Sequence, residues 1–221
     1  MKLRHEHKHI INLSDIMILR TRLSAVAKRD KHANPDGTYT VKSLYFDSYT
    51  DRALREKLDG VNPREKFRIR YYNCDTSFIR LEKKSKINGL CAKESVNITE
   101  EQCQMIIDGD IAFLIQSPNK LLNELYAKMQ YGLLRPRCIV TYTRESFVYP
   151  IGNVRITLDY NIGRSLSVCE FLNPDNVIVK PGQNSLVEVK YDQYLPEVIR
   201  NAVSLKSRRQ SAFSKYSAMR F

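Results

Sequence analysis

Residues 61–93 read VNPREKFRIRYYNCDTSFIRLEKKSKINGLCAK, and this stretch decides the fold. It opens on a turn signal at Asn62-Pro63, and apolar and charged side chains then alternate over residues 67–72 and again over 79–84. Alternation with a period of two places one set of side chains on each face of a β-strand. Only a short Asn-Cys-Asp-Thr break comes between the two regular runs, so they are predicted to pair as a hairpin.

One face of this predicted hairpin is apolar and the other is charged. The charged face collects Lys66, Arg68, Arg70, Arg80, Glu82, Lys84 and Lys86. Nearly all of these side chains are positive, and like charges on adjacent strands repel one another. Such a face requires bound anions or very good solvation.

The composition of the whole chain limits the class of protein. The 221 residues, 43% of them hydrophobic, suit one α+β or larger β domain, so we expect a single domain over residues 1–221. Lys and Arg total 36 against 24 Asp and Glu, which gives a formal charge of +12. That balance favours polyanionic partners, namely nucleic acid, anionic membrane or phosphate compounds, without choosing among them.

The cysteines and the apolar runs predict a cellular compartment. The five cysteines are odd in number, widely spaced and without a Cys-x-x-Cys pair, which is typical of free thiols in a reducing compartment. The N-terminus has no apolar signal-peptide region, and no apolar run is as long as a membrane span. We therefore expect a soluble cytoplasmic protein.

Periodicity and turn signals predict about eight strands and six helices. The strands are expected over 3–11, 38–47, 67–72, 79–84, 90–97, 137–149, 154–161 and 185–192, and the helices over 15–29, 50–58, 99–108, 119–131, 196–205 and 210–219. Most strands divide into an apolar and a charged face. This division fits either an open sheet with its charged face in water or a closed barrel with a polar lumen.

The chemistry of the charged faces favours the barrel. Arginine is frequent there and suits bidentate contact with phosphate. Carboxylates also occur there, each two residues from a cation: Glu6, Glu82, Asp159 and Glu188. Carboxylates that hold a metal ion, among Arg and Lys that hold phosphate oxygens, are what a metal–polyphosphate complex requires.

Three histidines at alternate positions of the first strand, His5, His7 and His9, are a weaker metal signal. Side chains on one face of a strand stand about 6.6 to 7 Å apart, which is wide for three ligands at about 2.0 Å from one ion. They are expected to form a partly exposed outer face.

A series of motifs in order along nearly the whole chain resembles the vacuolar transporter chaperone (VTC) domain, the polyphosphate polymerase branch of the triphosphate tunnel metalloenzymes. The motifs are Arg4-x-Glu6-x-Lys8, SLYFDSYTDRALREKLDG (43–60), FRIRYY (67–72), LEKKSK (81–86), TYTRESF (141–147), VRITLD (154–159), LVEVKYD (186–192) and FSKYSAMR (213–220). The resemblance implies a closed eight-stranded antiparallel β-tunnel with a polar lumen and flanking helices.

The resemblance also implies roles for individual residues. The phosphate-binding, catalytic set would be Lys8, Arg68, Arg70, Lys84, Arg144 and Lys215. Supporting substrate contacts would come from Arg55, Lys93, Tyr142, Arg155, Lys190 and Ser214. Glu188 would be the principal ligand of Mn²⁺ or Mg²⁺, with Glu6 and Glu82 as helpers. Many tunnel enzymes open with Glu-x-Glu-x-Lys, whereas Arg4 stands first here, which favours longer phosphate chains over the adenylate-cyclase and thiamine-triphosphatase branches.

The activity implied is transfer of the γ-phosphate of ATP to a growing polyphosphate chain. Two alternatives on the same fold remain open: hydrolysis of triphosphate or polyphosphate, and binding of polyphosphate or nucleotide without catalysis. Nucleic acid is not expected as a partner, since the aromatic residues form no platform interleaved with the basic ones. A membrane partner protein and the oligomeric state are left open.

Overall fold

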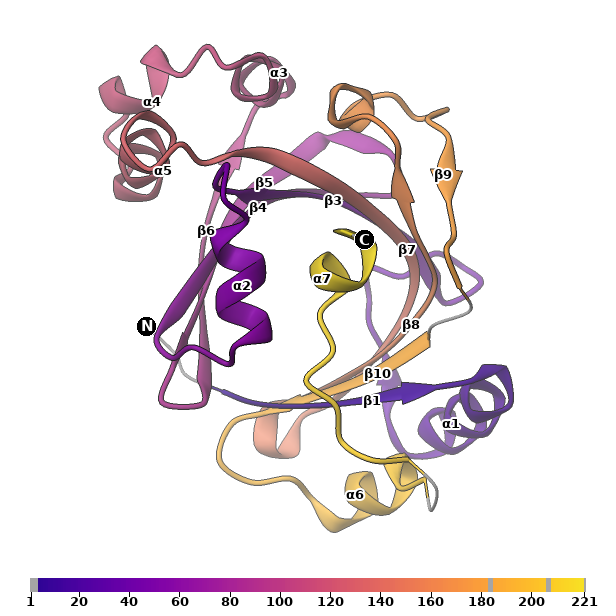
Figure 1. The fold of residues 1–221 in the computed structure, drawn as a ribbon. Coiled ribbons are helices and arrows are strands. Elements are labelled where there is room, and N and C mark those ends of the chain that lie inside the picture. The colour runs from indigo at the N-terminus through magenta and orange to yellow at the C-terminus, as the bar shows by residue number, and fades with distance from the viewer. Residues whose placement is uncertain (1–3, 183–184, 206–207, 221) are drawn as a thin grey trace.

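A single curled antiparallel sheet forms the centre of the computed structural model, which describes residues 4–182, 185–205 and 208–220 (Figure 1). Eight strands follow one another across it in the order β1-β10-β8-β7-β3-β4-β5-β6, while the short β2 pairs with β7 and β9 with β8. The bounds are β1 His5–Ile11, β2 Lys28–Arg29, β3 Thr38–Asp47, β4 Arg64–Tyr72, β5 Asp75–Ile87, β6 Leu90–Ile98, β7 Arg135–Tyr149, β8 Val154–Ser165, β9 Ile178–Val179 and β10 Ser185–Tyr191.

The hairpin predicted from residues 61–93 is confirmed as β4 and β5. Its register sets Ile69 opposite Leu81 and Arg68 opposite Glu82. Ile69 and Leu81 are fully buried in the outer core, whereas Arg68 and Glu82 line cavities inside the curl. The strict alternation of the sequence therefore separates the packed face from the charged face.

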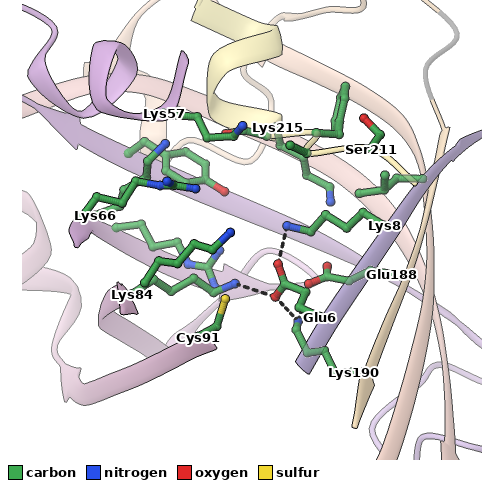
Figure 2. Close-up of a pocket in the computed structure, with 18 of the residues that line it drawn as sticks. Glu6, Lys8, Lys57, Lys66, Lys84, Cys91, Glu188, Lys190, Ser211 and Lys215 are labelled. Carbon is green, nitrogen blue, oxygen red and sulfur yellow. Dashed lines mark ion pairs between the residues drawn. The ribbon is translucent and has the colours of Figure 1, made fainter. Parts of the chain in front are cut away.

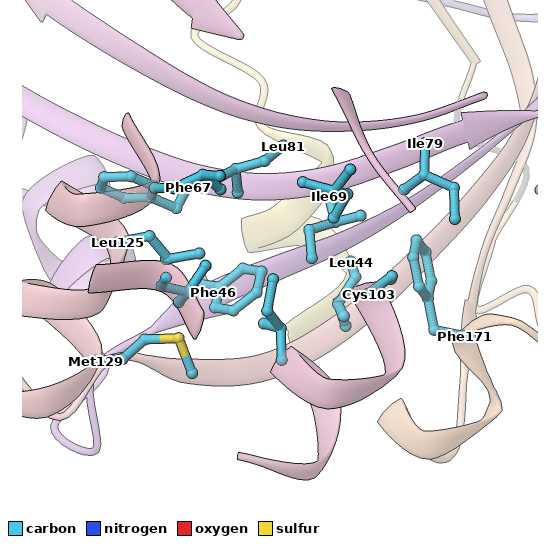
Figure 3. Packing of buried hydrophobic residues seen from close by; sticks show 14 of the residues in the cluster. Leu44, Phe46, Phe67, Ile69, Ile79, Leu81, Cys103, Leu125, Met129 and Phe171 are labelled. Carbon is cyan, nitrogen blue, oxygen red and sulfur yellow. The ribbon is translucent and has the colours of Figure 1, made fainter. Parts of the chain in front are cut away.

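Most of the helices cover the outer face of the sheet, in two groups. The helices are α1 Leu13–Val26, α2 Arg52–Leu58, α3 Glu100–Asp108, α4 Ala112–Gln116, α5 Lys120–Gln130, α6 Glu197–Val203 and α7 Lys215–Arg220, with 3₁₀ turns η1 at Ile151–Asn153 and η2 at Val168–Phe171. The apolar cluster under α3, α4 and α5 includes Phe46, Phe67 and Leu125 (Figure 3). A second cluster, under α1 and α6, includes Leu19, Phe147 and Ile199.

Helices α2 and α7 lie on the concave side (Figure 1). Tyr216 of α7 is buried, and its hydroxyl donates a 2.6 Å hydrogen bond to Asp47. The same carboxylate accepts from the backbone N–H groups of Ala53 and Leu54 at the start of α2. One buried carboxylate thus fixes the C-terminal helix against α2, with α7 inside the curl.

The sheet is a curled half-barrel, and the prediction of a closed barrel is wrong. Among the described residues, the edge strands β1 and β6 meet at one isolated bridge, where Arg4 and Cys91 exchange backbone hydrogen bonds of 3.3 and 3.4 Å. Further along β1, the backbone N–H of Ser211 donates to the carbonyl of Lys8 at 2.8 Å, and Gln210 bridges His9. Alternation indicates which face a side chain takes, but closure depends on strand stagger and tilt, which alternation does not carry.

Two helix predictions also need correction. The first helix begins after Asn12, which forms a capping box with Asp15, and it ends at Val26 so that Lys28 and Arg29 can pair with β7. The last helix begins at Lys215, because residues 210 and 211 instead bond along β1. In the described ranges, no helix combines the length and apolarity needed to cross a membrane.

Candidate functional site

Two adjoining cavities, of about 470 and 620 Å³, are lined by the charged face of the curled sheet. They share a wall made of Glu6, Arg68, Arg70, Lys84, Cys91, Arg144 and Lys190. The wall is drawn from strands at both edges of the sheet and from its middle. The curl therefore brings together side chains that lie far apart in the sequence.

All six residues of the predicted phosphate-binding set line the first cavity, although they come from five different elements. Lys8 is on β1, Arg68 and Arg70 are on β4, Lys84 is on β5, Arg144 is on β7, and Lys215 begins α7. Figure 2 shows Lys8, Lys84 and Lys215 directed into the same space.

The predicted supporting residues divide between the cavities. Tyr142, Lys190 and Ser214 line the first cavity, and Lys93, Arg155 and again Lys190 line the second. Arg55 lies on an exposed part of α2 and lines neither cavity, so we do not carry its predicted role further.

Tyr142 forms an aromatic surface that three cations face. The guanidinium carbons of Arg70 and Arg144 lie 5.9 and 5.2 Å from the ring centroid, and Lys215 Nζ lies 4.7 Å from it. Burial raises the pKa of Tyr142, so its hydroxyl stays neutral and accepts a 2.9 Å hydrogen bond from Arg70. The ring holds the cations in position without neutralising them.

Arg70 is the central cation with the least compensation. It is 5% exposed and donates to the hydroxyls of Ser43 and Tyr142, both at 2.9 Å. Among the described residues, no carboxylate lies within ion-pair distance of it, and Arg80 stands directly opposite on β5. A planar guanidinium that is held in place but lacks an anion is suited to bind phosphate oxygens.

Arg144 and Lys215 share one fully buried carboxylate, Asp159. Arg144 binds both of its oxygens, at 2.6 and 2.8 Å, and Lys215 Nζ lies 2.5 Å from one of them. Burial would raise the pKa of Asp159, but Arg144 and Lys215 outweigh burial and lower it to about 2. Asp159 therefore fixes both cations, which together still carry one positive charge in excess of its negative charge.

Replacing Asp159 with Asn should destabilise the protein by about 3–5 kcal/mol at pH 7, since two buried cations would lose their counter-charge. The depressed pKa means that Asp159 stabilises the fold above its unfolded pKa of about 4, and that this stability is lost as pH falls toward about 2. Urea unfolding from pH 7 to pH 2.5 should show a smaller acid-induced loss in the variant. An unchanged unfolding free energy at pH 7 would contradict this role.

Glu6 and Glu188 form a carboxylate pair within a group of lysines. Lys8 Nζ lies 2.5 Å from Glu6, and Lys190 Nζ lies 2.7 Å from Glu188 Oε1. Burial would raise the pKa of Glu188, but Lys190, Lys8 and Lys84 hold it well below its usual value. Both carboxylates are therefore ionised, side by side, in the first cavity (Figure 2).

A row of like charges runs across the hairpin next to this pair. Lys66, Lys84 and Lys93 occupy directly opposite positions on β4, β5 and β6. Burial lowers the pKa of Lys84 to about 7, with Lys190 and Arg68 acting in the same direction against Glu6. Like charges opposite one another destabilise a sheet, so an anion bound here would relieve repulsion already present in the fold.

Glu82, a predicted helper for the metal, is occupied by other partners. Arg68 Nε donates to it at 2.6 Å and Lys93 Nζ at 2.9 Å. Burial would raise its pKa, but Arg68, Arg70 and Lys93 hold it low. Both of its oxygens are used within the protein, which leaves Glu6 and Glu188 as the candidate ligands.

The Glu6–Glu188 pair fits a divalent cation that also binds phosphate. Glu6 Oε2 and Glu188 Oε1 are buried and accept no well-aligned hydrogen bond from the described residues, although Lys190 Nζ lies 3.7 Å from the first and 2.7 Å from the second. No group of three or more His, Cys, Asp and Glu in the described ranges is placed to hold a metal ion. Mg²⁺ is commonly bound by one or two carboxylates together with water and substrate phosphates, and two neighbouring ionised carboxylates match that requirement.

Comparison with known proteins agrees with this geometry. The VTC domain family matches residues 3–220. Similar solved structures include HpAC1 from Hippeastrum, with TM-score 0.57, 14% identity and coverage of 100% of this chain and 95% of that one. PH1012 from Pyrococcus horikoshii has TM-score 0.51, 13% identity and coverage of 98% and 99%. A candidate adenylate cyclase from Bacillus halodurans has TM-score 0.55, 11% identity and coverage of 86% and 80%.

These solved structures share the tunnel-like fold, and their low identities carry the comparison no further than fold. No curated protein matches the chain in sequence. The family match, in contrast, extends over nearly every residue and includes all the strands that build the cavity wall. The chain belongs to the VTC domain family.

Proposed function

We propose that this protein transfers the γ-phosphate of ATP to the end of a polyphosphate chain in the cavity bounded by its curled sheet. The observation that carries the proposal is the first cavity, where Arg70, Lys84 and Lys8 lie around the two ionised carboxylates of Glu6 and Glu188. Few ligands require a group of cations and a pair of carboxylates in the same cavity. A chain of phosphates with a divalent cation does, because its anionic oxygens would bind the Arg and Lys side chains and its metal ion would bind the carboxylates.

The cations act by positioning and by neutralising charge. Arg70, already fixed by Ser43 and Tyr142, would bind oxygens of the transferred group without reorganising. Arg144 and Lys215, fixed by Asp159, would bind phosphate beside the same Tyr142 ring. Both sets are in place before substrate binds, so the entropy of ordering them is not lost at the transition state.

The reaction exchanges one phosphorus–oxygen bond for another. A terminal oxygen of the acceptor chain forms a bond to the γ-phosphorus while the bond from that phosphorus to the β–γ bridging oxygen breaks, and ADP leaves with the electron pair. The acceptor oxygen is already ionised, so no general base is needed. Phosphoryl transfer of this kind depends on alignment and on stabilisation of charge, which are what this site provides.

Glu188 and Glu6 would hold the divalent cation, Mn²⁺ or Mg²⁺, which when bound would neutralise negative charge on the phosphate groups. Their lysine neighbours keep both carboxylates ionised and available as ligands.

Hydrolysis is the second candidate, because the same site would direct water instead of a phosphate chain at the γ-phosphorus. It is supported by the likeness in fold to HpAC1, which is described as having a dominant triphosphatase activity. No protein residue is the nucleophile in either reaction, so the two differ only in which acceptor occupies the cavity.

The two candidates separate in one assay. The protein is incubated with ATP and Mn²⁺, with and without a short polyphosphate primer, and products are resolved by gel electrophoresis and a free-phosphate assay. Lengthened chains with matching ADP are expected. Free phosphate alone would establish hydrolysis instead, and the absence of both products, together with retained binding of tripolyphosphate, would indicate a binding module.

A further inference from the structure

The first cavity ends in a group of four half-buried cations that lies outside the predicted site. We call it the cationic rim: Lys57 at the end of α2, Arg64 and Lys66 at the start of β4, and Lys86 near the end of β5. Figure 2 shows Lys57 and Lys66 beside the same open space as Lys84. The rim thus lines the same cavity as the central site, and its side chains come from α2 and from one end of the paired strands β4 and β5.

Within the described ranges, none of the four rim side chains lies within ion-pair distance of a carboxylate, although Asp47 acts on Lys66 from further away. In the same ranges, their one side-chain hydrogen bond joins Arg64 to the carbonyl of Val61 at 2.6 Å. Lys66 Nζ instead lies 5.2 Å from the centroid of the Tyr216 ring. The aromatic face attracts the ammonium group but does not cancel its charge.

The rim cations repel one another. Arg64 stands directly opposite Lys86 across the hairpin, and Lys66 stands opposite Lys84. Burial together with the charges of Arg64 and Lys57 lowers the pKa of Lys66 to about 8. Four neighbouring cations with no carboxylate of the described residues in ion-pair distance repel one another, so they point to an anion that binds among them.

Cations at the second cavity are arranged differently. Arg155 forms an ion pair with Asp30 at 2.5 Å, Lys93 with Glu82 at 2.9 Å, and Arg4 with Asp192 at 3.0 Å. That cavity is also lined by the aromatic rings of Tyr39, Tyr72 and Phe78. A highly charged chain leaving the centre therefore meets these three ion pairs and Arg80, which stands over the Phe78 ring, in one direction, and the four rim cations in the other.

We propose that the cationic rim is a binding site for the phosphates of a linear polyphosphate chain that extend beyond the central site, so that affinity rises with chain length. This inference rests on the proposed function, because it takes the central site to hold phosphate. A ligand of three phosphates fills the centre, and only a longer chain reaches the rim. The rim thereby selects long linear polyphosphate over short phosphate compounds.

The test compares two triple variants that remove the same charge. The rim variant carries Lys57→Gln, Arg64→Gln and Lys86→Gln. The control carries Lys31→Gln, Lys120→Gln and Lys180→Gln, which are exposed and line neither cavity. Affinities for tripolyphosphate and for a chain of several tens of phosphates are measured by calorimetry without ATP, at one ionic strength, and circular dichroism and thermal unfolding check that each variant is folded.

The rim variant is expected to lose about tenfold or more in affinity for the long chain and to retain its affinity for tripolyphosphate within about twofold. The control should behave as the wild type. The rim proposal would be overturned by equal losses of affinity for both ligands, by no loss of affinity for the long chain, or by the same loss in the control. A preference of the rim for a single-stranded oligonucleotide over polyphosphate would overturn it as well.

Failure of the rim and failure of the proposed function give different results. If wild-type protein binds tripolyphosphate but the rim variant binds long chains unchanged, the central site stands and the rim does not. If the wild type binds neither ligand, the central phosphate site itself is wrong and the rim proposal falls with it.

Discussion

Replacing Arg70 with Gln should lower kcat/KM for ATP-dependent phosphate transfer by about 10³-fold, which is the lower range of what a single arginine contributes to phosphoryl transfer. Arg70 is buried, fixed by two hydroxyls and, within the described chain, without a carboxylate in ion-pair distance. Its charge is therefore available to the substrate, whereas Arg68 and Arg144 divide theirs with Glu82 and Asp159. Arg70→Lys, which keeps the charge and loses the fork, should fall between the wild type and Arg70→Gln.

Stability separates this role from a structural one. Because Arg70 has no carboxylate partner, its removal leaves no unpaired carboxylate, and the melting temperature should stay within about 4 °C of wild type. Arg200→Gln, on the exposed face of α6, provides a control that removes one arginine charge elsewhere. Wild-type turnover in Arg70→Gln, or a loss explained entirely by unfolding, would refute the assignment.

Replacing Glu188 with Gln should abolish metal-dependent turnover, with a loss of at least about a hundredfold, since charge stabilisation by a bound cation is worth several kcal/mol. Binding of tripolyphosphate without metal should persist or strengthen, because the variant removes a negative charge from among Lys8, Lys84 and Lys190. Steady-state rates titrated with Mn²⁺, and calorimetry with tripolyphosphate in chelator, measure the two effects separately.

The control for Glu188 is Glu101→Gln on the exposed side of α3, which makes the same change in net charge. If Glu188→Gln kept the wild-type dependence of rate on Mn²⁺, then Glu188 would serve only as the ion-pair partner of Lys190, 2.7 Å away. A loss of both turnover and anion binding would instead indicate collapse of the lysine group that Glu188 holds together.

The alternation of residue types predicted most of the sheet and the inner face of each strand. The six cations of the predicted set occur on strands and a helix that the curl brings together, and all of them line one cavity. The family resemblance selected these six residues, and Lys215 lies on a helix, but the inward direction of the five on strands follows from the period of two. A register slip of one residue would have exchanged the packed and charged faces.

The ion pairs between side chains on neighbouring strands could not be predicted from the sequence. Asp159 was recognised as an inward acid, but its pairing with Arg144 depends on the register of β7 and β8. Glu82 looked like a free carboxylate until the register placed Arg68 opposite it. The exposed position of Arg55 on α2 and the gathering of Lys57 and Lys66 at one end of the cavity likewise depend on tertiary packing.

Closure of the sheet was the main error at the level of the fold. The period-two pattern is the same for an edge strand that pairs with a neighbour and for one that does not. Among the residues that the structure describes, β1 and β6 are joined at the single Arg4–Cys91 bridge, and the segment at Gln210 and Ser211 bonds to β1 beyond it. The sequence of that segment was compatible with a helix, but its backbone hydrogen bonds go to β1 instead.

The most direct test of the central claim is a crystal structure of the protein with tripolyphosphate and Mn²⁺. We expect phosphate groups inside the curl, in hydrogen-bond contact with Arg70 and Lys84, and a metal ion on Glu188. Phosphate bound only at the outer surface, with the first cavity filled by water, would contradict it.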